Sequence, residues 1–234
     1  MYGRLSVVAA LSLLTALSAE AQLCAGSASY TTGRMQVGGS LVSNGDYSSY
    51  GVGLNVGKSR GLYGDPQIAQ NNYDVIDESG LWLGAGAGFQ LRPAKAGFQI
   101  CPVASLGFGL GPNDIGGSGT DMSTRQFSAG AIIGMVAYRE SNFQLIPTGG
   151  LSVVNQSVKL ESSLGSAEDD ETFMALDLGA GFLVSSVWTI RPMVSIPLGA
   201  DNRDESFSLN VSYNFGKRAG APAQPARRPA RRSR

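Results

Sequence analysis

The sequence predicts an all-β fold, a single antiparallel up-and-down barrel that spans a membrane with its apolar face outward. The clearest observation is the stretch from Ser206 to Phe215, which alternates without exception between apolar and small polar residues. A period of two indicates a β-strand, because successive side chains point to opposite faces. The polar face holds Ser and Asn rather than Lys or Glu, which favours a barrel wall with lipid on its apolar side.

The start of the chain supplies the second observation. Arg4 precedes an apolar stretch from Leu5 to Leu17, and Ala19-Glu20-Ala21 follows with the small-x-small pattern of a signal-peptide cleavage site. This stretch is too short to cross a bilayer, which takes about 20 residues. We therefore expect a signal peptide over 1–21, a mature chain that begins at Gln22, and no transmembrane helix.

The alternation recurs along the chain and predicts further strands. It is clean in Tyr50–Val56, Leu81–Leu91, Gly97–Leu110, Met174–Val184 and Trp188–Leu198, and has more slips near 34–43, 123–139 and 142–159. In several of these stretches Leu, Ala or Val on one face opposes Gly on the other. A narrow barrel is filled by its own side chains, so inward glycines would make room for larger lumen residues.

The number of strands depends on residues 60–79. Ten strands result if Leu62–Asp74 is a strand, and eight result if the whole segment is one long outer loop. Single-chain bacterial barrels have even strand counts, so both totals are admissible. We favour ten, although Pro66 is the weak point because proline sits poorly in a hydrogen-bonded ladder.

The expected connections alternate in length. Pro93–Ala96, Glu140–Asn142 and Ser185–Val187 are short, whereas Gly111–Met122, Ser162–Thr172 and Gly199–Asp204 are longer and polar. Short periplasmic turns and longer outer loops are typical of outer-membrane barrels. On this assignment the acids Glu168, Asp169, Asp170 and Glu171 lie in an outer loop that is solvated by default; they could also gather Ca²⁺ or Mg²⁺, although no ligand spacing supports a metal site.

Aromatic residues are expected at both ends of the strands, where they would form belts at the two membrane interfaces. Those assigned to the periplasmic ends are Phe89, Phe98, Phe143, Trp188, Tyr213 and Phe215, and those assigned to the outer ends are Tyr50, Phe108, Phe127, Phe173 and Phe207.

Charge divides the chain into parts. Residues 217–234 contain seven Lys or Arg and no acid, whereas 22–216 contain 10 basic and 17 acidic residues, a balance of −7. We expect a periplasmic N-terminal segment at 22–33, the barrel at 34–216 and a disordered, basic, Pro- and Arg-rich periplasmic tail at 217–234. Both termini are then periplasmic, and export excludes a nucleic-acid partner for the tail.

The signal peptide, the alternating strands and the terminal Leu209-Asn210-Val211-Ser212-Tyr213-Asn214-Phe215 together resemble the small outer-membrane β-barrel superfamily. The resemblance covers about 34–216 and implies an integral location in the bacterial outer membrane. It also implies that Leu209, Val211, Tyr213 and Phe215 form the signal that the barrel-assembly machinery reads. Members usually end at this aromatic, whereas the present chain continues for 19 residues.

Two pairs of residues are candidates for a structural role inside the barrel. Cys24 and Cys101 are the only cysteines, and an exported protein favours a disulfide between them over two free thiols. Such a bond could contribute roughly 4 kcal/mol in the entropic description. Asp177 and Arg191 both point inward on consecutive expected strands, which favours a lumen ion pair over a pore-lining gate.

An enzyme is not expected, because barrel enzymes of the resembled superfamily generally use a histidine base and this chain has none. We expect no cofactor and no metal. The expected role is structural, adhesive or surface-interactive, with a narrow passive channel and a soluble secreted barrel around a lipophilic ligand as alternatives. Expected partners are outer-membrane lipids, lipopolysaccharide and the assembly machinery, with weak contact of the tail with cell-wall polymer or acidic inner-leaflet lipids; the default for the tail is no specific partner.

Overall fold

The protein was analysed as a computed structural model, in which the described residues are Cys24, 35–45, 47–57, 61–74, 76–91, 98–140, 142–185, 187–200 and 203–215. The expected signal peptide with its cleavage residues Ala19, Ala21 and Gln22, the rest of the 22–33 segment and the 217–234 tail lie outside them. These assignments therefore stay predictions.

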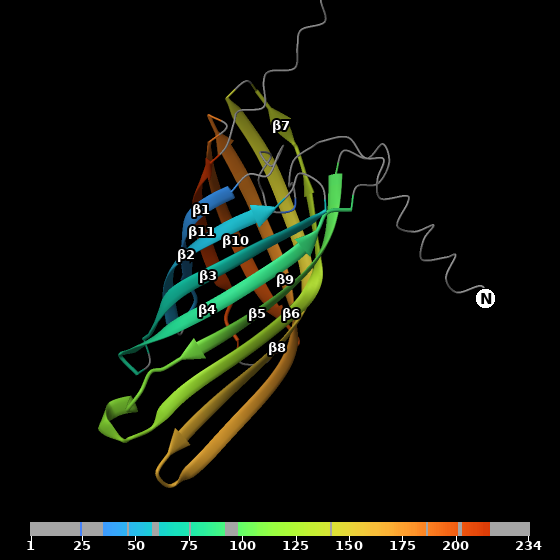
Figure 1. The fold of residues 1–234 in the computed structure, drawn as a ribbon. Helices are drawn as coiled ribbons and strands as arrows, with labels where there is room; N and C mark the ends of the chain where they lie inside the picture. The colour runs from blue at the N-terminus through green and yellow to red at the C-terminus, as the bar shows by residue number, and fades with distance from the viewer. Residues whose placement is uncertain are drawn as a thin grey trace, which may run out of the picture.

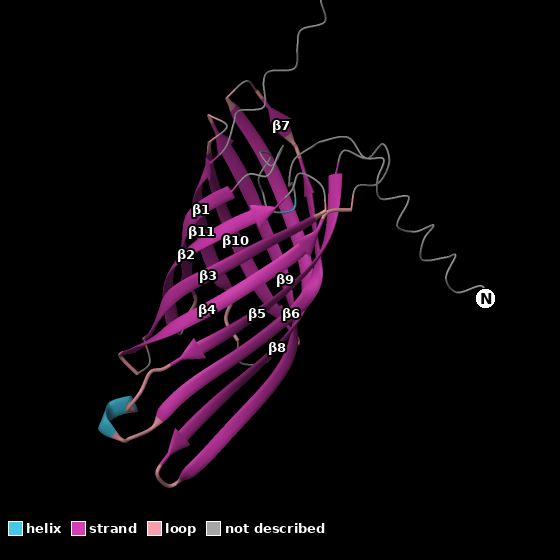
Figure 2. Ribbon diagram, in the orientation of Figure 1, coloured by secondary structure: helices cyan, strands magenta, loops and turns pink. Residues whose placement is uncertain are grey.

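The described residues form antiparallel strands that wind into one tilted barrel (Figures 1 and 2). The strands are β1 (Met35–Ser43), β2 (Tyr47–Gly57), β3 (Leu62–Tyr73), β4 (Glu78–Phe89), β5 (Phe98–Leu110), β6 (Asp121–Met135), β7 (Tyr138–Arg139), β8 (Phe143–Ser162), β9 (Gly165–Val184), β10 (Trp188–Leu198) and β11 (Ser206–Phe215). A short 3-10 helix, η3 (Ile115–Gly117), lies in the β5–β6 loop.

The barrel is closed, and ten strands form its wall. Each strand pairs with its neighbour in sequence, β6 pairs with β8, and β1 pairs with β11 from Met35↔Phe215 to Ser43↔Phe207. The two-residue β7 continues β6 after a break at 136–137, so it is not counted as a separate strand of the wall. The prediction of ten strands is confirmed, and the eight-strand alternative is wrong because Leu62–Tyr73 pairs with both β2 and β4.

Three prolines inside the strands lie at an interruption or an end of a ladder. Pro66 pairs with β4, but the β2–β3 ladder skips from Gly53↔Gln67 to Val56↔Gly64 beside it. Pro192 pairs with β11 while the β9–β10 ladder skips the positions opposite it, and the β6–β8 ladder stops one residue before Pro147. Because proline has no N–H to donate, these breaks explain how strands with proline fit a closed barrel.

The outer surface is an apolar band. Large apolar side chains alternate along every long strand and are exposed, among them Val37, Val52, Ile68, Leu83, Leu106, Ile133, Leu151, Leu178, Val194 and Val211. Along β10 the band runs from Trp188 to Leu198, about 34 Å of strand, or about 26 Å along the membrane normal at a tilt of about 40°. This height fits the outward apolar band of a membrane barrel, about 25 Å tall.

The direction of this band decides between two alternatives raised by the sequence. A soluble barrel around a lipophilic ligand would have its large apolar residues inside and polar residues outside. The observed exposure is the reverse, so the alternative of a soluble secreted barrel is wrong. No helix among the described residues has the length and hydropathy needed to cross a bilayer.

One expected loop is instead a continuous pair of strands. β8 and β9 remain paired from Phe143↔Val184 to Ser162↔Gly165, so only a two-residue turn separates them. Residues 168–171 therefore lie in β9 and not in a loop. The sequence assigned a strand near 142–159 but placed 162–172 in a loop, because Glu168 to Glu171 leave that stretch without apolar alternation.

Candidate functional site

The barrel offers two candidate sites, its lumen and the part of the sheet that protrudes beyond the apolar band. The lumen contains a cavity of about 210 Å³. Glycines leave room for the side chains that line this cavity. A Cβ on Gly86 would lie 2.2 Å from an Asp65 oxygen, and one on Gly88 would lie 2.3 Å from the Tyr63 ring. The expectation that inward glycines accommodate larger lumen residues is confirmed.

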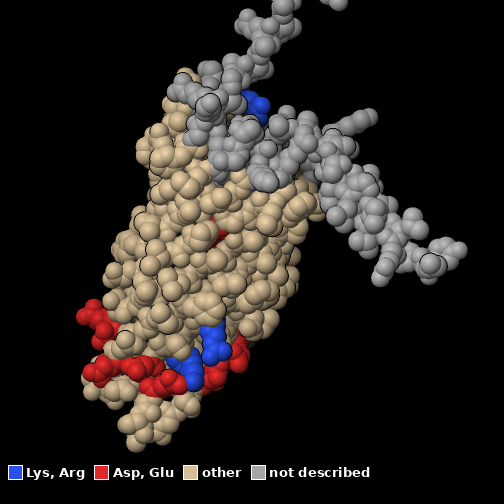
Figure 3. Space-filling model, in the orientation of Figure 1, with Lys and Arg blue, Asp and Glu red and all other residues tan. Residues whose placement is uncertain are grey.

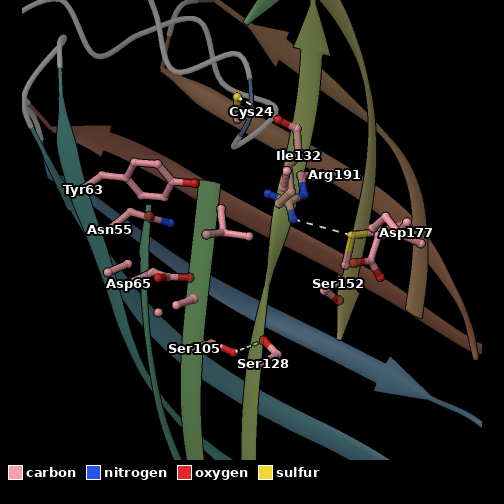
Figure 4. Close-up of a pocket in the computed structure, with 17 residues that line it drawn as sticks. Cys24, Asn55, Tyr63, Asp65, Ser105, Ser128, Ile132, Ser152, Asp177 and Arg191 are labelled. Atoms are coloured by element: carbon pink, nitrogen blue, oxygen red, sulfur yellow. Dashed lines mark hydrogen bonds between the residues drawn. The ribbon is translucent and has the colours of Figure 1, made fainter. Parts of the chain in front are cut away.

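Charged side chains from three strands meet at this cavity. Figure 4 shows Tyr63 and Asp65 of β3 on one side, Asp177 of β9 on the other, and Arg191 of β10 between them in this view. The Nη2 atom of Arg191 donates a hydrogen bond to Met193 Sδ at 3.6 Å. The structure thus places Asp177 and Arg191 in one cavity as expected from the sequence, while a direct ion pair between them stays a prediction.

Sequence reasoning missed two of these lumen residues, Tyr63 and Asp65. Both lie on β3, the strand made doubtful by Pro66, and its inward face is mostly polar. Alternation was present nonetheless, because Leu62, Pro66 and Ile68 form the exposed face of the same strand. Treating proline as a marker of a ladder break would have recovered both residues.

A disulfide closes one end of the cavity. Cys24 and Cys101 are bonded, with a Cα–Cα separation of 6.2 Å, and their side chains are 1% and 0% exposed. Cys24 lines the cavity, and its Sγ lies 3.5 Å from the carbonyl oxygen of Ile132 on β6. Among the described residues there is no free cysteine.

Nearer the protruding end, aromatic and charged side chains occupy the lumen. A Cβ on Gly107 would lie 2.0 Å from the Trp82 ring, so the inward-facing Trp82 ring covers part of the neighbouring strand β5. Farther out, Arg203 donates hydrogen bonds to Glu171 Oε2 at 2.6 Å and Gln156 Oε1 at 3.0 Å, and its guanidinium lies 4.5 Å from the Phe173 ring centroid.

The position of Phe173 corrects one assignment to the outer aromatic belt. Its ring lies against the Arg203 guanidinium, which also donates hydrogen bonds to the inward residues Glu171 and Gln156. Phe173 therefore faces the barrel mouth and not lipid. At the other end of the barrel the expected terminal residues do face outward. Tyr213 packs edge-on against Trp188 and Phe215, with ring centroids 5.0 Å and 4.9 Å away.

The protruding sheet consists of the outer parts of β6, β8 and β9. Beyond the apolar band, β8 and β9 each continue for eight residues, 155–162 and 165–172, or about 27 Å. Twelve of the fifteen acids among the described residues lie at this end of the barrel, in 74–78, 114–121, 161–171 and 204–205. Figure 3 shows them as red groups at the lower end, with a few basic groups beside them.

Local contacts hold several of these charges. Lys159 bonds to Glu161, which lowers the pKa of the Glu161 carboxyl through that hydrogen bond and the positive charge of Lys159. Ser157 donates to Glu168 at 2.9 Å, and Asn155 donates to Thr172 at 3.0 Å across the two strands. In the part of the chain that is described, no group of three or more His, Cys, Asp or Glu is placed to hold a metal ion.

These features define the class: a small, closed, lipid-facing antiparallel β-barrel of the outer-membrane type. No family model matches the chain, and no curated protein matches it. Solved structures with a similar strand arrangement include Ail, the attachment invasion locus protein of Yersinia pestis (14% identity, 79% of this chain and 99% of that one, TM-score 0.41).

Two further structures are similar in the same sense. They are the N-terminal β-barrel domain of Pseudomonas aeruginosa OprF (10% identity, 79% and 98% coverage, TM-score 0.35) and the translocator domain of the autotransporter NalP from Neisseria meningitidis (13% identity, 78% and 86% coverage, TM-score 0.41). The class assignment depends on this chain's own strand order and exposed apolar band.

Proposed function

We propose that the protein is an integral, non-catalytic barrel of the bacterial outer membrane that presents a rigid polar sheet at the cell surface. The observation that carries this proposal is the continuous β8–β9 pairing, which runs past the apolar band to Ser162↔Gly165. A paired hairpin holds its side chains in fixed positions, whereas a mobile loop would have to be ordered on binding. The protruding end would face outward, and both termini would be periplasmic.

The filled lumen supports a presenting role over the alternative of a narrow channel. The cavity near Arg191 is bounded by the buried disulfide at one end, and Trp82 and Arg203 occupy the lumen toward the other. A barrel of this strand number has little interior space beyond its own side chains. The apolar band on the outside of the barrel would contact outer-membrane lipids and lipopolysaccharide. The assembly machinery would recognise β11 during insertion.

Conductance of the refolded full-length protein and antibody labelling of cells that express tagged protein together test the proposal. Planar-bilayer recordings should show no steady openings, both before and after reduction of the disulfide. A peptide tag inserted after Ser163, beside Leu164 at the hairpin tip, which is 98% exposed, should bind antibody on intact cells. A tag after Arg234 should bind only after the cells are permeabilised. Steady conductance, or a hairpin tag that stays inaccessible on intact cells, would contradict the proposal.

A further inference from the structure

The protruding sheet has an edge that no described strand covers. Pairing of β9 with β10 ends at Met174↔Leu198, while pairing with β8 continues to Gly165. Residues 165–173 therefore have a neighbour on one side only within the described chain. About half of these residues direct both their N–H and C=O groups toward the open side, since these groups alternate along an antiparallel strand. Such an edge is a template for another strand.

The charges beside the edge select what can pair with it. The protruding parts of β8 and β9, 155–162 and 165–172, contain Lys159 and five acids. Glu168 and Glu171 are held by Ser157 and Arg203, whereas Asp169 and Asp170 make no hydrogen bond or ion pair with other described residues. Adjacent positions of a strand point to opposite faces, so one free carboxylate borders the edge on each face.

This arrangement disfavours pairing between two copies of the chain. Two antiparallel β9 edges would bring their four consecutive acids opposite each other, and like charges directly opposite are destabilising. A strand with Lys or Arg on both faces would instead place opposite charges in cross-strand positions while its backbone completes the ladder. Edge acids that block self-association thus leave a site for a basic partner.

We propose that residues 165–173 of β9 bind an extended, Lys- or Arg-rich polypeptide segment by strand addition, with Asp169 and Asp170 as the determinants of charge selectivity. The inference rests on the proposed function, since it names the partner class of the surface that the protein presents. It differs from simple attraction to an acidic patch, because the partner must be extended and must have free backbone N–H groups.

The test titrates refolded full-length protein in lipid nanodiscs with a Thr-Lys-Lys-Val-Val-Lys-Lys-Thr peptide, whose lysines fall on both faces of an extended strand. The control peptide, Thr-Lys-Lys-Pro-Pro-Lys-Lys-Thr, has the same charge but lacks two adjacent backbone donors, one on each side of an extended strand. We expect the first peptide to bind at least about tenfold more tightly than the second. It should also protect amides within 165–173 from hydrogen exchange. Equal affinity for both peptides, or no binding, would overturn the proposal.

A matched pair of variants locates the site. Asp169→Lys/Asp170→Lys should reduce the affinity for the first peptide at least about tenfold, since it reverses the two unpaired charges. Asp74→Lys/Glu78→Lys makes the same charge change at the β3–β4 turn, away from the open edge, and should leave affinity within about twofold. Equal loss in both variants, or a dimer of the unmodified protein without peptide, would refute the assignment. The bilayer recordings and the antibody labelling of the hairpin tag test the presenting role independently of peptide binding.

Discussion

At the scale of single residues, several large side chains in the lumen lie against glycines of neighbouring strands. Trp82, Tyr63 and Asp65 fit only because glycine stands opposite each of them on a neighbouring strand. The sequence predicts this exchange in general terms, since glycine alternates with apolar residues in 81–91. Which large residue occupies which space depends on the register between strands, and the sequence of one chain does not specify that register.

Gly107→Ala should destabilise the barrel by about 1–3 kcal/mol, because the added Cβ would lie 2.0 Å from the Trp82 ring and force it to move. Urea unfolding in detergent, followed by heat-modifiable gel migration, measures the change. Gly39→Ala is the control, since its Cβ would meet its nearest atom at 3.7 Å. Adding Trp82→Ala to Gly107→Ala should remove most of the Gly107→Ala penalty; an additive loss would show that the ring is not the obstacle.

Reduction of the Cys24–Cys101 disulfide, or Cys101→Ser, should lower the free energy of unfolding by roughly 4 kcal/mol, since the bond closes a loop with a sequence separation of 77. Unfolding of oxidised and reduced protein in the same detergent provides the comparison. Cys24→Ser should give the same loss as Cys101→Ser. A reductant that leaves the unfolding midpoint of the unmodified protein unchanged would contradict this expectation.

At the scale of elements, alternation predicted the membrane-spanning strands well because lipid imposes one polarity on one face. Residues 162–172, at the end of the long β8–β9 hairpin, were assigned to a loop because water imposes no such difference on their two faces. Pro66 made β3 the weakest of the expected strands, and the structure confirms this strand, which pairs with both β2 and β4. The sequence therefore located the wall of the barrel better than its protruding end.

Val194→Arg places a charge at the middle of the β10 band, where Val194 is 38% exposed on the lipid side. We expect a loss of about 2–4 kcal/mol in unfolding free energy, because a charged side chain near the bilayer midplane is poorly solvated. Ser79→Arg, on the same outer surface but at the end of the apolar part of β4, should cost about 0–1 kcal/mol. Folding titrations in lipid vesicles distinguish the two, and equal costs would refute the assigned membrane level.

Replacing Ser157–Asp170 by an Asn-Gly turn should leave a folded barrel. Gln156 and Glu171 already face each other in the ladder, so the shorter hairpin keeps the remaining pairs in register. Heat-modifiable migration should persist, while binding of the basic peptide should disappear. Loss of heat-modifiable migration would show that the extension contributes to the stability of the wall as well as to the surface.

At the scale of the whole molecule, charge is distributed by end. Most described acids gather where the sheet protrudes, and the apolar outer band lies between that end and the short turns. The sign of this distribution was visible in the sequence as a balance of −7 over 22–216. Its location was visible in part, since Glu168 to Glu171 were expected in an outer loop; the structure places them at that end of the barrel but in β9. The fold thus separates a lipid-facing part from a charged part along one axis.

The seam between β1 and β11 has a consequence for biogenesis. Its nine residue pairs join Met35–Ser43 to Phe207–Phe215, segments that lie at opposite extremes of the strand order. Without β11 the remaining strands cannot close the barrel, because β1 and β10 would each keep an unpaired edge. Truncation anywhere inside β11 should therefore yield a species prone to aggregation before insertion.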